Sequence, residues 1–449
     1  MSLPPGPSTP ALLQRVRYLR DPLGVIDACA KQYGDVFRLN LSKQGWVFLC
    51  NPADVRELYA EGSDTFAAGE AKRSVFGKLL GSSSSLLLDG PAHRRRRKLL
   101  VPKFRGDNMR AQSDLLRELC ATAVEQWVRR GRIRLHDELH ELVRRAIVHS
   151  IFGQHESREL FAAIGTFADK AVGSKLLMFP SLQVDLGPWS PWGRIERIIK
   201  NVDREVYAEI ARRRSAPPQD DLLGSLLEAT GEDGQALSDT EVRDEILTLV
   251  VAGHEITTAV LSWLFYAIVS RPQVLANVRR ELADRLRPGE WRVDELVYLD
   301  AVMRESLRFY STIPNGSARI ARVPTKIHGF DIPAGALVTV AMHRLHRRPE
   351  IFMDPDRFVP DRFLTAKPAP YQFAPFGGGD RRCLGMAIAI HEVKTIVATV
   401  LSHVDLRCSL STVRPIRRGA FLAPQDGLPV EVSSLEASIS RDGVGAVVV

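Results

Sequence analysis

Residues 376–385 read FGGGDRRCLG and directly precede a helical pattern over residues 386–403. Cys383 therefore stands at the start of a helix, beside the basic side chains of Arg381 and Arg382. A helix dipole and nearby positive charge stabilise a thiolate, the form of cysteine that ligates metals or acts as a nucleophile. The three glycines let backbone N–H groups approach and hydrogen-bond the sulfur. The loop thus predicts a metal-ligating or nucleophilic cysteine.

Two other interpretations compete for this loop. A lone cysteine usually behaves as a small buried hydrophobe, and a glycine-rich turn before a helix can cradle phosphate. A P-loop, however, needs a Lys-Ser/Thr pair, and a dinucleotide fold needs GxGxxG at a helix start; residues 376–385 contain neither. The buried-cysteine interpretation stays open on the loop alone.

The composition of the chain limits the class of protein to which it can belong. Of the 449 residues, 45% are hydrophobic and 25% charged, which suits a large soluble globular protein. No linker-like segment divides the sequence, so we expect one large domain over residues 1–432 and a disordered tail over residues 433–449. The five cysteines form no CxxC pair, and no signal or anchor segment is recognisable at the N-terminus. We expect a cytoplasmic monomer without a membrane anchor.

A net charge of +8 is a property that nucleic-acid-binding proteins often share. Lys and Arg are spread along the chain, and no nucleic-acid-binding module accompanies them, so we expect no nucleic-acid partner. A solvated basic surface is the ordinary explanation of such a charge. The more specific one is a basic face on which an acidic protein docks.

Hydrophobic periodicity predicts a mainly α protein with small β-sheets. Strand-like segments at 35–39 and 45–50 indicate a small sheet near the N-terminus, and residues 107–308 follow helical patterns. Strand-like pieces beyond Arg319 predict a second small sheet. The stretch 349–376 is irregular and rich in Pro and Phe, and so long an irregular connection usually carries function.

The longest helix opens with the capping box Ser238-Asp239-Thr240-Glu241 and need not stop before Pro272. At 1.5 Å per residue it would be about 50 Å long. Its centre is apolar enough to resemble a membrane span, but His254 and Glu255 would be costly in a bilayer. We therefore expect a helix through the core of a large soluble protein.

Read as FxxGxRxCxG, the loop resembles the haem-ligand loop of the cytochrome P-450 monooxygenases, and this pattern is highly specific. The fixed positions are Phe376, Gly379, Arg381, Cys383 and Gly385. The resemblance extends over almost the whole chain in the right order. It implies the helix-rich P-450 fold, one haem b, and an iron held by Cys383, with Phe376, Gly377 and Gly385 also next to the cofactor.

Glu305 and Arg308 resemble the ExxR pair of that family, with Arg362 as the third member of its Glu-Arg-Arg network. Such a buried group would fix the irregular stretch against a helix and keep the Cys383 loop rigid. The ExxR spacing alone is uninformative, because ordinary surface pairs give it too. It recurs at Glu70/Arg73, Glu141/Arg144 and Glu209/Arg212.

Haem propionates need cationic donors in fixed positions. By resemblance these are His93, Arg97, Arg319 and Arg381. For the other members of the basic run 94–98, a solvated helix face is the ordinary expectation. Three of them would alternatively contact an acidic ferredoxin: Arg94, Arg95 and Lys98.

The long helix resembles the family's oxygen-binding helix through Ala252-Gly253-His254-Glu255. There Gly253 would make room for dioxygen and Glu255 would relay protons, although a helix glycine can also serve close packing. The family usually has Thr after the acid; this chain has Ile256, followed by Thr257 and Thr258. Because a helix turns about 100° per residue, Thr257 can substitute only with a local distortion such as a π-bulge. Thr257, a substrate hydroxyl or water would then complete proton delivery.

The resemblance implies oxidation of a hydrophobic small molecule by dioxygen, with electrons from NAD(P)H through a separate ferredoxin and reductase. A terpenoid, fatty acyl or polyketide substrate suits the apolar residues expected around the haem, although core packing alone can explain such residues. The expected pocket residues are Phe76, Leu249, Ile256, Ile313 and Phe421. A haem-thiolate isomerase, dehydratase or coupling enzyme is the main alternative, and a haem sensor the more distant one.

Overall fold

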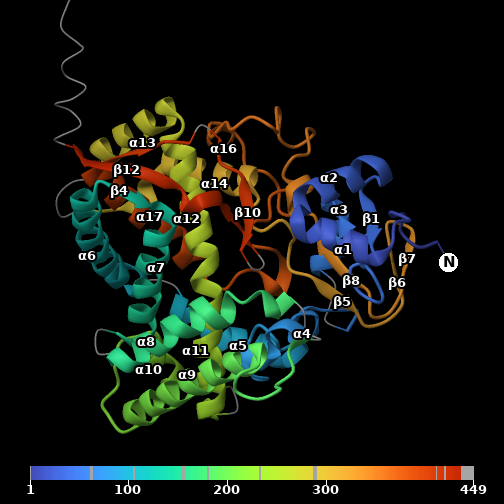
Figure 1. Cartoon of the computed structure of the whole chain (residues 1–449), viewed down its shortest axis with the longest axis horizontal. Coiled ribbons are helices and arrows are strands. Elements are labelled where there is room, and N and C mark those ends of the chain that lie inside the picture. The colour runs from blue at the N-terminus through green and yellow to red at the C-terminus, as the bar shows by residue number, and fades with distance from the viewer. Residues whose placement is uncertain are drawn as a thin grey trace, which may run out of the picture.

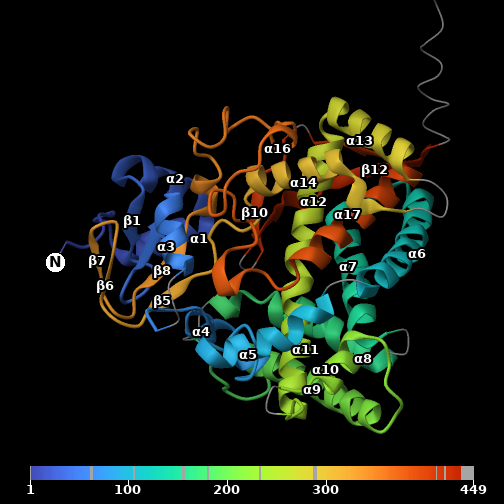
Figure 2. The same ribbon diagram turned by 180° about the vertical axis from the view of Figure 1, so that it is seen from behind.

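The computed structural model describes residues 2–60, 64–104, 107–153, 157–178, 182–231, 234–286, 291–410, 412–418 and 421–435. A helical body lies beside a smaller β-rich part, as the two opposite views of Figures 1 and 2 show. The mainly α fold with small sheets that the sequence predicts is confirmed. The α-helices are α1 (Ala11–Arg20), α2 (Pro22–Tyr33), α3 (Pro52–Ala60), α4 (Ala68–Leu80), α5 (Gly90–Leu100), α6 (Asp107–Arg130), α7 (Leu135–Phe152), α8 (Arg158–Thr166), α9 (Pro191–Arg214), α10 (Leu222–Glu228), α11 (Asp239–Gly253), α12 (Glu255–Val269), α13 (Pro272–Arg285), α14 (Val297–Tyr310), α15 (Met342–Leu345), α16 (Arg362–Thr365) and α17 (Met386–His403).

The strands that the sequence places in two sheets mostly belong to one. A five-stranded sheet has the order β1-β2-β8-β5-β3, and its β2 and β8 pair in parallel, with Trp46 opposite Leu337. The expectation of a separate second sheet beyond Arg319 is therefore wrong for β5 and β8, since their buried residues share one hydrophobic cluster with β1 and β2. The strands are β1 (Val36–Leu39), β2 (Trp46–Leu49), β3 (Phe66–Ala67), β4 (Arg132–Arg134), β5 (Arg319–Ala321), β6 (Thr325–Ile327), β7 (Phe330–Ile332), β8 (Leu337–Val340), β9 (Val404–Cys408), β10 (Pro415–Arg418), β11 (Phe421–Pro424) and β12 (Pro429–Ser434).

The expected long helix runs through the core but is not continuous. Its capping box forms at Ser238 and Glu241, as predicted. The helix then breaks at His254, which has φ −88° and ψ −71° and separates α11 from α12. By length and composition, residues 239–269 could cross a membrane, yet 67% of their most apolar window is buried inside the protein. A core helix is thus confirmed, and the single uninterrupted helix is wrong.

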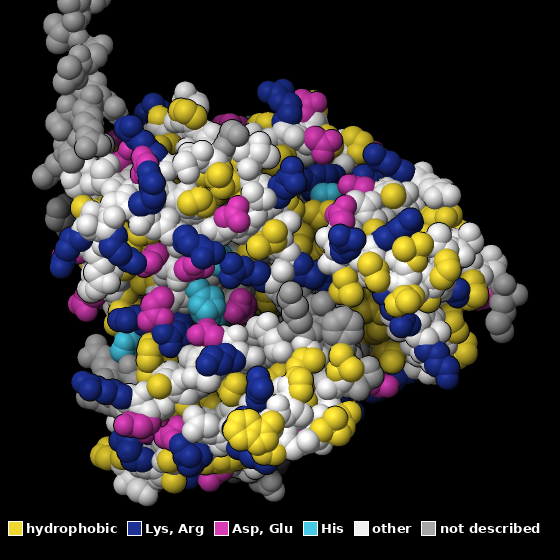
Figure 3. Space-filling view, in the orientation of Figure 1, with side chains coloured by type: hydrophobic (Ala, Val, Ile, Leu, Met, Phe, Trp, Pro, Cys, Tyr) yellow, Lys and Arg dark blue, Asp and Glu magenta, His cyan; other side chains and the backbone are white. Residues whose placement is uncertain are grey.

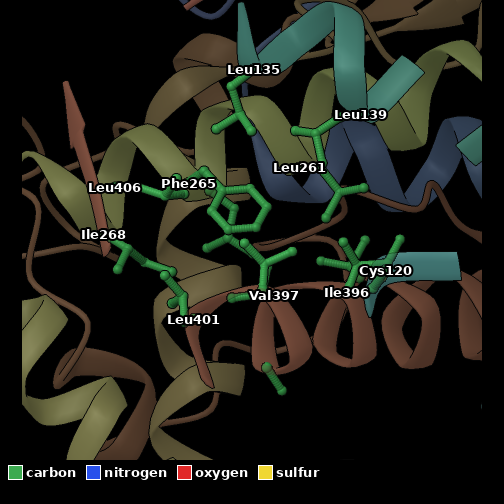
Figure 4. Close-up of a cluster of buried hydrophobic side chains, with 14 of the residues drawn as sticks. Cys120, Leu135, Leu139, Leu261, Phe265, Ile268, Ile396, Val397, Leu401 and Leu406 are labelled. Carbon is green, nitrogen blue, oxygen red and sulfur yellow. The ribbon is translucent and has the colours of Figure 1, made fainter. Parts of the chain in front are cut away.

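The largest hydrophobic cluster forms around α12. Leu261 and Phe265 of α12 pack against Val397 of α17, between side chains from α6 and α7 (Figure 4). Because the side chains of α12 are apolar on almost every face, the helix is stable only where other elements surround it. This packing holds α12 and α17 in fixed relation, and the loop that contains Cys383 leads directly into α17.

One member of the basic run on α5 differs from the expected solvated face. Arg96 is only 4% exposed and pairs with Glu241 at 2.5 Å and Glu245 at 2.8 Å. The same Glu245 accepts a hydrogen bond from the backbone of Ser85 at 2.7 Å. Arg96 therefore links α5 to α11 through buried ion pairs and is not a surface charge. Its neighbours Arg94, Arg95 and Lys98 are exposed, as expected.

The surface and the C-terminus bear on two other expectations. On the face shown in Figure 3, Lys and Arg side chains are scattered among acidic and hydrophobic ones. Strand β12 pairs with β9 as far as Ser434, so ordered structure extends two residues into the predicted tail. The rest of that tail, 436–449, lies outside the described residues.

A buried ion-pair network ties the irregular stretch to α14. Glu305 and Arg308 are fully buried, and two hydrogen bonds of 2.7 and 2.8 Å join them. Glu305 also accepts hydrogen bonds from Arg362 at 3.3 Å and from the backbone of Val359 at 2.7 Å. The remaining donors of Arg308 reach carbonyl oxygens of His346, Pro355 and Arg357. The arrangement thus matches the predicted Glu-Arg-Arg network.

The other ExxR spacings behave differently. Glu141 and Arg144 form an i,i+3 pair in which the Glu141 side chain is 39% exposed. Glu70 pairs with Arg322 at 2.9 Å. Glu209 is buried, unlike a member of a surface pair, but it binds Arg212 and Arg213 of its own helix. Of these pairs, as far as the described residues show, the one on α14 alone fixes a distant segment of irregular backbone, so position in the chain and not spacing identifies it.

Glu305→Gln should lower the free energy of unfolding by about 3 kcal/mol or more, because it leaves buried Arg308 without its counter-charge. The matched change Glu141→Gln, in a half-buried pair of the same spacing, should cost less than about 1 kcal/mol. Urea unfolding followed by circular dichroism measures both. Equal losses in the two variants would contradict a special role for the α14 network.

Candidate cofactor site

Close packing shapes the Cys383 loop. The backbone N–H of Cys383 donates to the carbonyl oxygen of Phe376 at 2.9 Å and closes the loop. Gly377 and Gly379 have φ values of 71° and 60°, in the left-handed region that favours glycine. A Cβ on Gly379 would also lie 2.1 Å from the carbonyl oxygen of Tyr59 on α3. These glycines are therefore needed for the turn and for contact with α3.

The sulfur of Cys383 has a hydrogen-bond donor and two cations near it. Gly385, the residue before α17, donates its backbone N–H to the sulfur. Burial raises the pKa of the Cys383 thiol, and this hydrogen bond and the charges of Arg97 and Arg382 only partly offset the effect. The predicted donation by the preceding glycines is thus replaced by donation from Gly385. A metal ion bound to the sulfur would ionise the thiol outright.

The predicted propionate ligands lie close together. His93 of α5, Arg319 of β5 and Arg381 of the Cys383 loop line one cavity of 230 Å³. Burial and the charges of Arg381 and Arg97 lower the pKa of His93 to about 3, so the ring is neutral at neutral pH. Arg97 is half-buried one turn after His93, and its charge acts on both His93 and Cys383. The structure therefore brings all four predicted residues to one region.

An unsatisfied guanidinium shows what this cavity suits. Arg319 is 3% exposed, and its Nη1 has no hydrogen-bond partner among the described residues. Its planar group lies over the ring of Tyr59 at 5.3 Å, and the buried Tyr59 hydroxyl also has no partner within the described part of the chain. Arg381, by contrast, is bound to Asp89 at 2.5 Å. Buried donors of this kind fit the carboxylates of a bound ligand, as haem propionates require.

Sequence reasoning missed Lys72 of α4. Its Nζ donates to the carbonyl oxygen of Ala68 at 3.0 Å, and burial with the charges of Arg319 and Arg381 lowers the pKa of Lys72 to about 7. Lys72 is thus a further basic group near the two guanidinium groups. No sequence signal distinguishes it from other lysines, because its place depends on how α4 packs against β5.

On the oxygen side, the acid of the motif has a partner that the sequence did not reveal. Glu255 lies 3.1 Å from His140 of α7. Burial alone would raise the pKa of Glu255, but the hydrogen bond with His140 and the charge of His140 lower it below its usual value. Glu255 is therefore ionised at neutral pH. His140 stands 115 positions away in sequence, and no pattern links the two.

The helix deviates near Ile256, because it breaks at His254, two residues earlier. That this deviation lets Thr257 take the place of the usual Thr stays a prediction. The Thr258 hydroxyl donates to the carbonyl oxygen of His254 at 3.0 Å. Thr257 is buried next to it, and Ala252 is exposed on the last turn of α11.

Gly253 and the expected pocket residues have mixed outcomes. A Cβ on Gly253 would lie 2.9 Å from the side chain of Ile147 on α7, so close packing accounts for at least part of its role. The five pocket residues come from five separate places in the fold and are all half-buried, and Phe76 and Leu249 lie at the edge of a hydrophobic cluster. Their role as a shared pocket stays a prediction. The five are Phe76, Leu249, Ile256, Ile313 and Phe421.

Comparison with known proteins gives consistent results. The family model described as Cytochrome P450 matches residues 3–432. A Mycobacterium tuberculosis protein named as cytochrome P450 135B1 is 33% identical and covers 96% of this chain and 92% of its own length. Another from that organism, named as cytochrome P450 138, is 30% identical with 95% of each chain covered. The retinoic acid-bound cyanobacterial CYP120A1 structure has a TM-score of 0.82 at 25% identity and covers 97% of this chain and 100% of its own.

The family model spans nearly the whole chain, and the relatives match along almost their full length. The fold, the cysteine loop and the cluster of buried cations agree with that match. The chain belongs to the cytochrome P450 family and is a haem-dependent monooxygenase.

Proposed function

We propose that this enzyme oxidises a hydrophobic small molecule of the terpenoid, fatty acyl or polyketide kind, in the cytoplasm and as a monomer. The half-buried apolar residues on α4, α11, α12 and β11 support an apolar substrate. The retinoic acid in the cyanobacterial relative is a hydrophobic ligand of the same general type. A screen for substrates by the spin-state shift of the haem tests the substrate class.

The observation that carries the cofactor assignment is the unsatisfied guanidinium of Arg319 in a cavity that His93 and Arg381 also line. These residues and Arg97 would hold the propionates, and Cys383 would ligate the iron. When bound, the haem supplies oxygen activation, which a thiolate ligand favours. The protein's own contribution is to fix the cofactor, admit the substrate and move protons.

The carbon monoxide difference spectrum tests the thiolate. The wild-type protein should show the band of thiolate-ligated haem, and Cys383→His should shift it to the position typical of histidine-ligated haem. Cys408→Ser is the matched control, because Cys408 lies on β9 in the C-terminal sheet and should leave the spectrum unchanged. A wild-type band at the histidine position would refute ligation by Cys383.

Proton delivery is assigned to Glu255 with Thr257. Glu255 is ionised and partly accessible, with 15% of its side chain exposed, so it can exchange protons with water. Thr257 is the next hydroxyl after Ile256, and the break at His254 gives α12 a different start from a straight helix. The Thr258 hydroxyl already donates a hydrogen bond to the carbonyl oxygen of His254, so Thr257 is the better candidate for proton delivery.

Two quantities test this relay: the turnover rate, and the ratio of product formed to NAD(P)H consumed. Glu255→Gln should slow turnover about 10²-fold, in the range that general acid–base groups contribute. Ile256→Thr should raise the ratio and Thr257→Ala should lower it, whereas Thr258→Ala serves as the control for loss of a neighbouring hydroxyl. If Ile256→Thr and Thr257→Ala both leave the ratio unchanged, neither residue belongs to the relay.

The isomerase, dehydratase or coupling alternative rests on Ile256, because the usual Thr is absent. Turnover with isotopically labelled dioxygen distinguishes a monooxygenase from these alternatives. A monooxygenase incorporates one labelled oxygen atom into its product, and an isomerase or dehydratase incorporates none. A haem sensor would show no substrate-dependent consumption of NAD(P)H.

We also infer that electrons come from NAD(P)H through a separate reductase and an acidic ferredoxin that docks on α5. Arg94 and Lys98 are exposed there and line a surface hollow of 390 Å³ with Arg97, next to the Cys383 loop through Asp380. Helix α5 lies at the front of the view in Figure 2. Exposed cations of this kind steer an acidic partner by long-range attraction.

Stopped-flow reduction by a ferredoxin tests the docking face. Arg94→Glu with Lys98→Glu should slow reduction about tenfold or more at low ionic strength, and added salt should shrink the difference. Arg129→Glu with Arg285→Glu makes the same change of charge on α6 and α13 and should have little effect. Equal slowing by both double variants would indicate a general charge effect and contradict the assignment to α5.

A further inference from the structure

His140, His254 and Glu255 form a cluster at the helix break. Their nitrogen and oxygen ligand atoms all lie within 4.8 Å of one another. The centroids of the His140 and His254 rings are 4.1 Å apart. The three residues come from α7, from the break itself and from the first residue of α12, and α7 packs directly against α12 (Figure 1). The cluster is thus built by two long core elements.

His254 has a free lone pair that points to a ligand. Its Nε2 donates to the carbonyl oxygen of His140 at 3.0 Å, so the proton of the neutral ring is on Nε2. Its Nδ1 is then a bare acceptor, and it is buried without a partner among the described residues. His254 itself is 1% exposed. A histidine that donates one N–H to a backbone carbonyl and offers the other nitrogen is the usual arrangement of a metal ligand.

The other two members supply the rest of a coordination shell. Nε2 of His140 is 3.1 Å from Oε1 of Glu255, close to the separation of about 3.3 Å between two ligands on a tetrahedral zinc ion. Asp169, in the π-helical segment Phe167–Val172, adds a carboxylate 3.8 Å from the same nitrogen. The Asp169 side chain is 50% exposed, so it can act as a fourth ligand or hold a bound water.

The charges of the cluster also suit a cation. His140 and His254 offer imidazole nitrogens and Glu255 offers carboxylate oxygens. Two imidazoles with one or two carboxylates form a ligand set that zinc accepts. An entry path exists, since the side chains of His140 and Glu255 are 23% and 15% exposed.

We propose that His140, His254 and Glu255 bind a divalent cation of the zinc class, with Asp169 or water as the fourth ligand. None of the three residues is among those that would hold the haem. The ligand atoms need to move by at most about 1.5 Å to reach tetrahedral spacing. Bound zinc replaces the hydrogen bond between His140 and Glu255 and fills the unsatisfied position on His254.

Zinc at this place would hold the carboxylate of Glu255. If Glu255 relays protons, as in the proposed function, the bound ion stops that movement and lowers the product formed per NAD(P)H. Zinc binding itself does not depend on the proposed function. The cluster thereby provides a site through which a metal ion inhibits turnover.

The test uses the haem-loaded protein, treated with a chelator and then titrated with zinc chloride against a chromophoric zinc indicator. One zinc ion per chain should bind to the wild type. His140→Gln and His254→Gln should each weaken binding at least about tenfold, because even outer-shell changes cost that much. His149→Gln, the same change on the same helix outside the cluster, should bind as the wild type does.

Three results would overturn the site: no zinc bound by the wild type, equal affinity in the wild type and His140→Gln, or equal weakening by His149→Gln. X-ray absorption of the zinc-loaded wild type is a second measurement that needs no variant, and it should show two imidazole nitrogens with carboxylate oxygen. A spectrum with fewer than two imidazoles contradicts the assignment. Zinc bound as expected with unchanged turnover would confirm the site and refute the proton role of Glu255.

Discussion

The carboxylate of Glu305, buried between two guanidinium groups, is the contact on which the cofactor side of this fold depends. Burying such charges is costly unless every donor and acceptor is satisfied. Here the carboxylate accepts hydrogen bonds from Arg308, Arg362 and the backbone of Val359. Arg308 also donates to two carbonyl oxygens of the irregular stretch, those of Pro355 and Arg357, and to that of His346 just before it. The stretch gains through these bonds the fixed shape that it cannot obtain from helix or strand hydrogen bonds. The Cys383 loop begins where this fixed segment ends.

A second set of charges, around Arg319, is arranged in the opposite way. The carboxylate of Glu305 accepts four hydrogen bonds, whereas a buried N–H of Arg319 has no acceptor among the described residues, and the neighbouring Lys72 has a lowered pKa. A protein tolerates such an excess of buried positive charge where an anionic ligand completes it. The network at Glu305 is complete in the protein itself, and the cluster at Arg319 is complete only with a ligand. That difference separates a structural site from a binding site.

Local sequence predicted what depends on local chemistry. The loop around Cys383, the capping box at Ser238 and most strand positions could be predicted, because glycine turns, caps and alternation act over a few residues. The pairing of β2 with β8 could not, since the parallel partner is almost 300 positions away. Arg96 was expected on a solvated face because its neighbours are basic, and only the packing of α5 on α11 buries it. His140 and Lys72 were missed for the same reason.

The break at His254 connects several of these departures. Ile256 stands two residues after the break, at the position where the family usually has its hydroxyl. At the break, His254 donates to the carbonyl oxygen of His140, and the next residue, Glu255, lies beside the His140 side chain. The histidine partner of the acid and the cluster of ligand atoms both lie at this one break in the helix. That the break also lets Thr257 serve in place of the usual Thr stays a prediction.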